Sequence, residues 1–392
     1  MIDSMAMVKP IEEKKSGIVF SYFYVCALAY VLLPIPFDFL AKLELLTFPI
    51  SAIIRVTILL LFILYKNQYL KKYSVLLVLT IFSSIFAILL AKNILINFGT
   101  PYLFLKMMVV VVMAVILTNV MNVKELILIT KIFLVIYALN SILIIIGAFF
   151  DINIFDTGGP SYRFGYSGIL PAAGNESAIL LMIMFTAIYF NTYHFNYLEI
   201  SKSNSYIILL CFLISMLLSG SKLATLYPFV LFISHRMTFR HSYIVLISIA
   251  SILYLLYLNL ERMLTIFSYF YNYYNDKGII PMLLASRNYR LANYDFDFNF
   301  IGFLIGNSSE MINFEMDILT VYYNLGVIGI IILCIPFLWC IVPRIRSRIS
   351  LAYSSSILVT IFLTGHIIES GFLLVPLIAL SKIFFKYDRK SI

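Results

Sequence analysis

The stretch "DTGGPSYRFGYSGILPAAGNESA", residues 156–178, separates two long apolar runs and differs sharply from both. It holds glycines, prolines and one arginine, Arg163, in a chain of 392 residues that is 62% hydrophobic and 12% charged. So few polar side chains cannot cover a soluble globule of this size. Apolar runs joined by polar loops of this kind predict an all-α polytopic membrane protein.

Hydropathy predicts about twelve spanning helices, because a helix needs about 20 apolar residues to cross the hydrocarbon core. The first run resembles a signal peptide's opening, but it is too long and lacks a small-residue cleavage site, which predicts a retained helix. No linker or repeat marks a second domain, so residues 1–392 are predicted to form a single membrane domain. The approximate spans are 17–36, 47–65, 74–91, 103–121, 126–149, 176–192, 205–219, 223–234, 243–259, 318–342, 351–365 and 371–386.

Basic residues in the short loops set the predicted orientation. By the positive-inside rule, the side that carries them is cytoplasmic, and both termini are predicted to lie on that side. The net charge of +9 is explained by the basic residues of the short loops, which set the orientation of a membrane protein. These residues are not gathered on one face, so no nucleic-acid partner is expected. The basic clusters fall at residues 66–72, 235–241, 344–348 and 386–390.

The cysteines do not predict a metal site. All of them fall inside apolar runs and show no paired spacing of the CxxC kind, which favours packing or lipid-facing roles. They are Cys26, Cys211, Cys334 and Cys340.

Two loops on the predicted extracytoplasmic side are longer than a connection needs, at about residues 150–175 and 260–316. Long loops are usually functional or disordered, and the mixture of cations, acids and glycines in the second favours order. An isolated loop arginine is commonly a solvated or snorkelling charge. Here, however, Arg163, Arg287 and Arg290 share one side of the membrane. Arginine grips phosphate oxygens bidentately and glycine lets backbone N–H groups approach an anion, so we expect a phosphorylated ligand at the outer leaflet.

The spacing of these residues is similar to a known family. Ten residues separate Arg163 from Gly174, and fifteen separate Arg290 from Gly306. Both patterns resemble the two periplasmic motifs of Wzy-type O-antigen polymerases.

Further residues resemble the wider superfamily of O-antigen ligases and polymerases. Nine residues separate the pair Glu315–Met316 from Gly326, and two separate Gly326 from Gly329. The ligases have the pattern His-Asn, nine residues, Gly, two residues, Gly. The glutamate in place of histidine resembles a polymerase more than a ligase. The sequence Ser-Gly-Ser-Lys at 219–222 is similar to the superfamily's Ser-Gly-Ser-Arg.

The resemblance implies a GT-C-like membrane glycosyltransferase of the bacterial inner membrane with a periplasmic active site. Such a polymerase joins oligosaccharide repeat units carried on undecaprenyl diphosphate, and its expected partners are a flippase, a chain-length-regulating co-polymerase and membrane lipid. Donors aimed at the leaving diphosphate stabilise the transition state. The candidates are Arg163, Arg290, Arg287 and Lys222, with Gly174, Asn175, Gly306 and Asp317 as further substrate contacts.

Two readings of Glu315 remain open. It is the best candidate for a general base toward the acceptor hydroxyl, or it interacts with the dipole at the N-terminus of a helix. His366, three residues before Glu369, is a secondary candidate for base or sugar contact, or an interfacial histidine. Asp295 and Asp297 are the only close pair of aspartates in the outer loops. They do not form a convincing metal site, and no cofactor is expected.

Three other functions remain as alternatives. Within the same enzyme class, a ligase would move finished chains onto a lipid A-core. A flippase or other transporter would place charges deep in its spans, where Arg55 and Lys131 are the clearest examples. A scaffold of an envelope complex would explain the membrane bundle but not these spacings.

Overall fold

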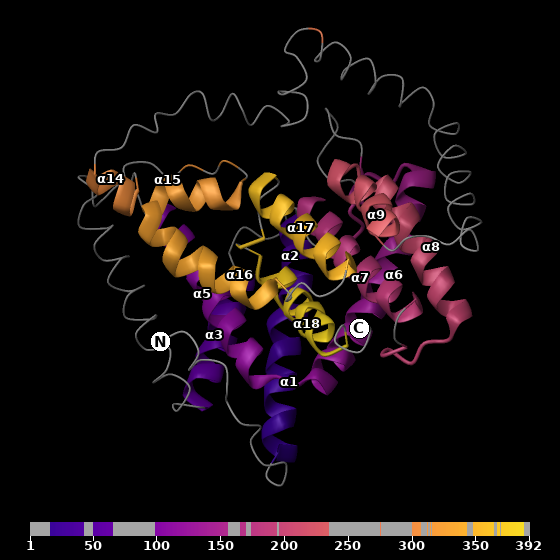
Figure 1. The fold of residues 1–392 in the computed structure, drawn as a ribbon, viewed down its shortest axis with the longest axis horizontal. Helices are drawn as coiled ribbons and strands as arrows, with labels where there is room; N and C mark the ends of the chain where they lie inside the picture. The colour runs from indigo at the N-terminus through magenta and orange to yellow at the C-terminus, as the bar shows by residue number, and fades with distance from the viewer. Residues whose placement is uncertain are drawn as a thin grey trace.

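The computed structural model describes residues 16–42, 50–65, 99–155, 165–169, 174–193, 196–234, 300–306, 316–342, 348–363, 367–368 and 370–387, with the single residues Asn275, Ile312 and Phe314. Within these ranges the regular secondary structure consists of helices (Figure 1). The larger α-helices are α1 (Ser16–Leu32), α2 (Pro34–Lys42), α3 (Ile50–Tyr65), α5 (Gly99–Val120), α6 (Val123–Phe150), α7 (Gly174–Tyr193), α8 (Lys202–Leu218), α9 (Lys222–Ser234), α15 (Asp317–Gly329), α16 (Ile335–Ile341), α17 (Arg348–Leu363) and α18 (Gly371–Tyr387). Short elements are η3 (Asn153–Phe155), α14 (Phe300–Ile305) and the π-helical turn η5 (Ile330–Cys334).

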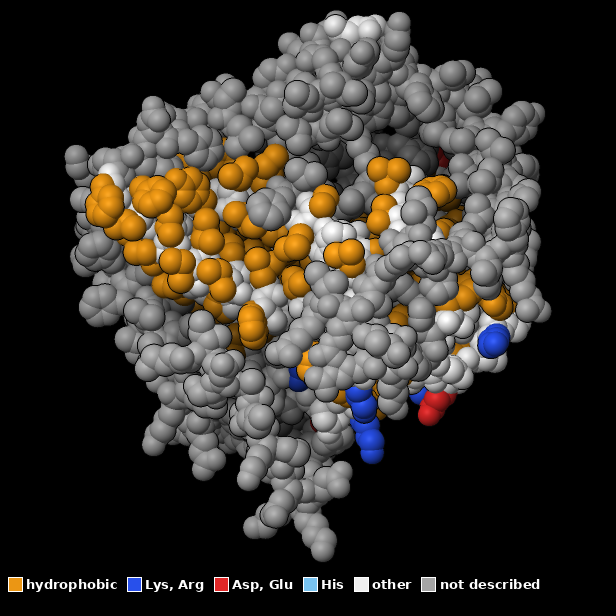
Figure 2. Space-filling view, in the orientation of Figure 1, with side chains coloured by type: hydrophobic (Ala, Val, Ile, Leu, Met, Phe, Trp, Pro, Cys, Tyr) orange, Lys and Arg blue, Asp and Glu red, His pale blue; other side chains and the backbone are white. Residues whose placement is uncertain are grey.

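Within the described residues, three helices are long and apolar enough to cross a membrane, namely Val123–Phe150, Glu176–Tyr193 and Asp317–Ile341. Shorter apolar helices pack around them. Figure 2 shows that the described side chains on one face of the molecule are mostly hydrophobic. The described chain is thus all-helical, as predicted, and it contains helices that are long and apolar enough for a membrane protein. The predicted spans 74–91 and 243–259 lie outside the described residues.

Two predicted spans are interrupted in the structure. The run 17–36 is divided into α1 and α2 at Leu33, because Pro34 and Pro36 follow and proline lacks the N–H that an uninterrupted helix needs. The run 318–342 is bent at Gly326, whose backbone is not helical (φ 64°, ψ −162°). The predicted loop 260–316 also contains a helix, α14.

Helices α6, α7, α8 and α18 form a bundle with two distinct ends. At one end Lys382 of α18 donates a hydrogen bond to the carbonyl oxygen of Met121, just before α6, at 3.1 Å. The ring of Phe190, near the end of α7, lies 4.7 Å from that of Phe384, near the end of α18. This end, where α6 begins and α7 and α18 finish, is called the carboxyl end below.

The opposite end, called the loop end, is where α7 and α18 begin and α8 finishes. Helix α9 starts there and runs back beside α7. Two contacts show this: the hydroxyls of Thr186 in α7 and Tyr227 in α9 are hydrogen-bonded, and the Phe232 ring of α9 lies 5.5 Å from the Tyr189 ring of α7. The predicted spans 205–219 and 223–234 are therefore two helices of a hairpin. The short turn of this hairpin lies at the loop end.

Two glycines allow α14 and α15 to cross in direct backbone contact. A Cβ atom on Gly306 would come within 3.0 Å of the Asn324 and Leu325 backbone, and one on Gly326 within 3.0 Å of the Leu304 backbone. Both glycines also have positive φ angles, of 81° and 64°, which side chains disfavour. The glycines of two separate sequence motifs thus meet at one helix crossing.

We expect Gly326→Ala to lower the free energy of unfolding by about 2 kcal/mol or more, because the new methyl group meets backbone and the φ angle becomes strained. Ile331→Ala, on an exposed apolar side chain a few residues later, serves as the matched control. Thermal unfolding of the detergent-solubilised proteins measures both. Equal midpoints for the two variants would contradict a structural role for the crossing.

Candidate functional site

The described part of the first loop, residues 165–169, is fixed to the middle of α6 by one buried amide. Asn140 donates from Nδ2 to the Ser167 carbonyl oxygen at 3.0 Å and accepts at Oδ1 from the Ile169 N–H at 2.9 Å. Its side chain is 2% exposed. Gly168 has a φ of 69°, and a Cβ there would collide with the Asn140 amide. The segment 165–169, which begins two residues after Arg163 in the sequence, is therefore held in a fixed position. Arg163 itself lies outside the described residues.

The same loop contacts the turn between α8 and α9. The Tyr166 N–H donates to the carbonyl oxygen of Leu218, the last residue of α8, at 3.0 Å. Ser177, in the first turns of α7, donates from Oγ to the Ser167 carbonyl oxygen at 3.2 Å. The loop segment that follows Arg163 is thus joined by hydrogen bonds to the end of α8 and to the start of α7.

The turn at 219–222 is closed by its own serines. Ser219 donates from Oγ to the Met216 carbonyl oxygen at 2.7 Å and accepts from the Ser221 N–H at 3.4 Å. Ser221 accepts at Oγ from the Ala224 N–H at 3.4 Å and so caps α9. Lys222, a predicted substrate contact, is the first residue of α9, and the predicted contacts Gly174 and Asn175 are the first two of α7.

The second loop is held by another buried amide, on α15. Asn324 donates from Nδ2 to the Ile312 carbonyl oxygen at 2.7 Å and accepts at Oδ1 from the Ile312 N–H at 3.1 Å. The Phe314 N–H donates to Thr320 Oγ1 at 3.2 Å. Ile312, Phe314 and Met316 are all buried against this helix. The segment that precedes α15 is therefore folded back along it.

Asp317 joins this segment to the start of α18. Its carboxylate oxygen Oδ2 accepts hydrogen bonds from the N–H groups of Ile367 and Ile368, at 2.8 and 3.1 Å, and the side chain is 2% exposed. Met316 is the N-cap residue of α15, and its side chain makes no capping hydrogen bond. Asp317, in the first turn, is therefore both a favourable charge at a helix N-terminus and a clamp on residues 367–368.

The structure thus brings together the chain positions next to two of the predicted catalytic residues, Glu315 and His366. Met316 follows Glu315 and Ile367 follows His366, and Asp317 connects these two places. Glu315 and His366 themselves lie outside the described residues. The same holds for Arg287, Arg290, Glu369, Asp295 and Asp297.

The anchoring residues Asn140 and Asn324 are what sequence reasoning missed. Each is a single amide within an apolar helix, in "YALNSIL" and "VYYNLGV". An amide in an apolar run is costly unless it is hydrogen-bonded, so its presence indicated a buried partner. It did not indicate which loop that partner belongs to.

No metal ligand set occurs in the described part of the chain: no group of three or more His, Cys, Asp or Glu side chains could hold an ion there. All four cysteines are free, and three of them are buried in the helix bundle, in agreement with the packing role expected for them.

Comparison with known proteins gives no assignment. No family model, no curated protein and no solved structure matches the chain. The case for a function therefore depends on residue types, their spacing and the geometry of the loop end.

Proposed function

We propose that this protein is a Wzy-type O-antigen polymerase that joins lipid-linked oligosaccharide repeat units at the periplasmic face of the bacterial inner membrane. The single observation that supports the proposal is that described residues beside the resembling motifs are held together in two separate places. The loop segment after Arg163 is hydrogen-bonded to Leu218, directly before the Ser-Gly-Ser-Lys turn, and to Ser177 at the start of α7. Gly306 and Gly326 meet at the crossing of α14 and α15, and Asp317, the first residue of α15, binds residues 367–368.

In the proposed reaction, a hydroxyl oxygen of the incoming unit attacks the anomeric carbon of the growing chain. The bond from that carbon to the diphosphate oxygen breaks, and undecaprenyl diphosphate leaves with the electron pair. Arg163 and Arg290, with Arg287 and Lys222, donate hydrogen bonds to the diphosphate as its charge increases. Glu315 takes the proton of the attacking hydroxyl.

Asp317 acts in this scheme as a positioning residue and not as a sugar contact. Its carboxylate is buried, and Oδ2 already accepts two backbone N–H groups. Hydrogen bonds to a charged acceptor are stronger than neutral ones, so the clamp fixes residues 367–368 relative to the start of α15. Glu315 and His366 neighbour the two sides of the clamp in the sequence. The clamp would therefore keep the distance between them constant.

The position of Lys131 argues against the transporter alternative. Lys131 and Arg55 are the two charged residues within predicted spans that favour it. Lys131 Nζ pairs with Glu199 at 3.1 Å, and the Glu199 side chain is 81% exposed. Glu199 lies in the segment between α7 and α8, at the carboxyl end, so this pair does not line a central path. A ligase remains the second candidate, separated from a polymerase by its need for a lipid A-core acceptor.

Replacing Arg163 or Arg290 with alanine should abolish polymer ladders, because the leaving diphosphate loses its planar donors. Lysine should restore little activity, since it lacks the bidentate fork. The readout is the ladder made by purified protein from lipid-linked repeat units alone, a test that also separates polymerase from ligase. Lys202→Ala, on an exposed cation at the start of α8, is the control and should leave ladders intact. Normal ladders in both alanine variants would contradict the proposal that these arginines bind the leaving diphosphate.

Glu315→Gln should lower turnover by roughly a hundredfold while donor lipid still binds, because the amide keeps the shape but not the basicity. If Glu315 only interacts with the helix dipole, the change should cost about 1 kcal/mol of stability or less and leave turnover near normal. Turnover and thermal stability are measured on the same purified variant. A stable and active Glu315→Gln protein would transfer the role of base to His366.

Asp317→Ala should lower the free energy of unfolding by about 2 kcal/mol, because two buried N–H groups lose their acceptor. It should also lower kcat more than it raises the KM for donor lipid, as expected of a positioning residue. Asp317→Asn keeps one acceptor oxygen and should restore part of both. If the alanine variant lost stability but kept its kcat, the clamp would have no part in the reaction.

A further inference from the structure

Helix α6 has one buried face and one exposed apolar face that continues to its last residue. The buried face includes the polar side chains of Asn140 and Ser141. The exposed large apolar residues are mostly three or four positions apart, so they form one stripe along the helix. Beyond Lys131 they are Val135, Leu139, Ile142, Ile146, Phe149 and Phe150, with exposed fractions from 36% to 75%.

Charged residues mark the two limits of this stripe. Lys131 pairs at 3.1 Å with Glu199 of the carboxyl end, whose side chain is 81% exposed. Asp151, which is also exposed, caps the other end of α6. The 19 residues between them, 132–150, carry no charge, and the 20 positions from Lys131 to Asp151 correspond to about 30 Å of helix. This length matches the hydrocarbon core of a bilayer, so lipid covers the stripe and the outer boundary of the core lies near Asp151.

The chain that follows α6 turns back along the buried face of the helix. The Ile152 N–H donates to the Gly147 carbonyl oxygen at 3.0 Å. Phe155 packs on the same glycine, where an added Cβ atom would lie 2.9 Å from the Phe155 Cβ. Further from the end of the helix, segment 165–169 is hydrogen-bonded to the Asn140 amide. The described parts of this loop therefore lie beside α6 and not beyond its end.

The position of Asn140 gives the depth of this segment. Asn140 lies 11 positions before Asp151, which corresponds to about 16 Å along the helix axis. A helix tilt of about 20° shortens this depth by only about 6%. Ser167 and Ile169, whose backbone groups contact the Asn140 side chain, therefore lie close to half the thickness of the hydrocarbon core.

The hydrogen bonds of the segment agree with this depth. Residues 165–168 are buried, and each backbone N–H from 166 to 169 has an acceptor within the protein, at 2.8 to 3.3 Å. A loop in water does not need such partners, whereas irregular backbone at membrane depth does. The donors are Tyr166, Ser167, Gly168 and Ile169, and the acceptors are the carbonyl oxygens of Leu218 and Phe155 and the amide oxygen of Asn140.

The turn at 219–222 also lies below the outer boundary. Ser215 of α8 donates from Oγ to the Ser141 carbonyl oxygen at 3.1 Å, and α8 ends three residues later, at Leu218. The 17 residues of α8 are about 25 Å long, which is less than the hydrocarbon core. The α8–α9 hairpin therefore turns before it reaches the level of Asp151.

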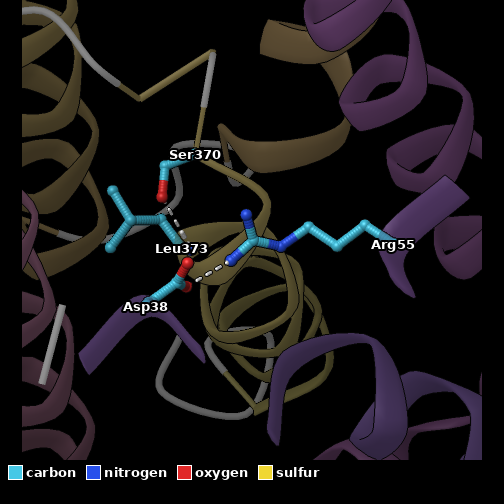
Figure 3. Close-up of polar contacts among 4 residues, drawn as sticks. All are labelled: Asp38, Arg55, Ser370 and Leu373. Atoms are coloured by element: carbon cyan, nitrogen blue, oxygen red, sulfur yellow. Dashed lines mark hydrogen bonds and ion pairs between the residues drawn. The ribbon is translucent and has the colours of Figure 1, made fainter. Parts of the chain in front are cut away.

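An ion pair between α2 and α3 gives a second example of a polar group matched within the protein. Arg55 is the only charged residue of the apolar helix α3. Its terminal nitrogen Nη2 lies 3.0 Å from Oδ2 of Asp38 in α2 (Figure 3). A polar side chain in an apolar helix is costly without such a partner, and Asn140 obtains its partner from segment 165–169.

We propose that residues 165–169 form a re-entrant segment in the outer half of the membrane, and that lipid-linked diphosphate reaches the site sideways from the bilayer. The second step rests on the proposed polymerase function, whereas the first does not. Arg163, two residues before the segment, then meets the diphosphate at the level of the lipid head groups. The polyprenyl chain stays in the bilayer throughout, so no apolar surface has to be transferred to water.

The first test maps the membrane along α6 without altering the re-entrant segment. Single cysteine substitutions are spin-labelled in phosphatidylcholine nanodiscs, in a Cys211→Ala background, because the other three native cysteines are buried. Collisions with oxygen, which is enriched in hydrocarbon, are compared with collisions with a water-soluble nickel chelate. The labelled positions are Val135, Leu139, Ile142, Ile146 and Phe150.

We expect the ratio of oxygen to nickel collisions to be highest at positions 139 and 142 and to fall toward 150. A maximum near position 135, with positions 146 and 150 open to the nickel chelate, would overturn the proposal, because segment 165–169 would then lie at the membrane surface. If the profile is as expected but the protein makes no ladder from lipid-linked repeat units, the polymerase assignment fails while the re-entrant segment stands.

The second test measures amide hydrogen exchange of residues 165–169 in the same nanodiscs. Wild type should protect them, and Asn140→Leu should speed their exchange about tenfold, because the Ile169 N–H loses its acceptor. Asn191→Leu is the matched control, since its buried amide oxygen accepts from the Leu198 N–H at the carboxyl end. It should leave residues 165–169 protected. Fast exchange of these residues in wild type would contradict a re-entrant segment, whether or not Asn140→Leu folds.

Discussion

The non-helical backbone at the loop end depends on three buried side chains that take the place of water. Asn140 pairs with residues 167 and 169, Asn324 pairs with Ile312, and Asp317 accepts from residues 367 and 368. In a hydrocarbon environment an unpaired peptide group is costly, so irregular backbone persists only where protein groups satisfy it. Each of these side chains satisfies two backbone groups at once. They therefore decide where the chain can depart from helix, and the candidate site is built at those places.

The two ends of the bundle use different chemistry. At the carboxyl end, the Lys382 ammonium donates to the carbonyl oxygens of Thr118 and Met121, where α5 finishes. A cation there satisfies carbonyl groups that a helix terminus leaves unpaired and interacts favourably with the negative end of the dipole. At the loop end, amide and carboxylate acceptors bind N–H groups of loops instead. At the carboxyl end, hydrogen bonds thus join helices directly to one another. At the loop end, they hold the non-helical segments between the helices.

This division is compatible with glycosyl transfer from one lipid diphosphate to a sugar on another. Such chemistry needs fixed positions for two large substrates more than it needs a bound metal, because the leaving group is already a stabilised anion. The crossing at Gly306 and Gly326, the turn at 219–222 and the clamp at Asp317 provide fixed backbone at three places. The arginines proposed to meet the leaving diphosphate are carried by the loops that these anchors hold.

Most of the helices could be predicted from the sequence alone, because in lipid the length and polarity of an apolar run decide whether it can form a spanning helix. The predicted spans 126–149, 176–192 and 371–386 differ from α6, α7 and α18 by three residues or fewer at each end. The motif spacings predict two loops of related function, and this stays a prediction. The bend at Gly326 could not be read from hydropathy, since it exists only because the α14 backbone crosses there. Likewise, the sequence shows Asn140, Asp317 and Arg55 as polar residues in or beside apolar runs, but their partners are 27, 50 and 17 positions away. Tertiary structure alone decides such pairings, because a hydrogen bond depends on which groups packing brings within 3 Å or so, and not on their distance along the chain.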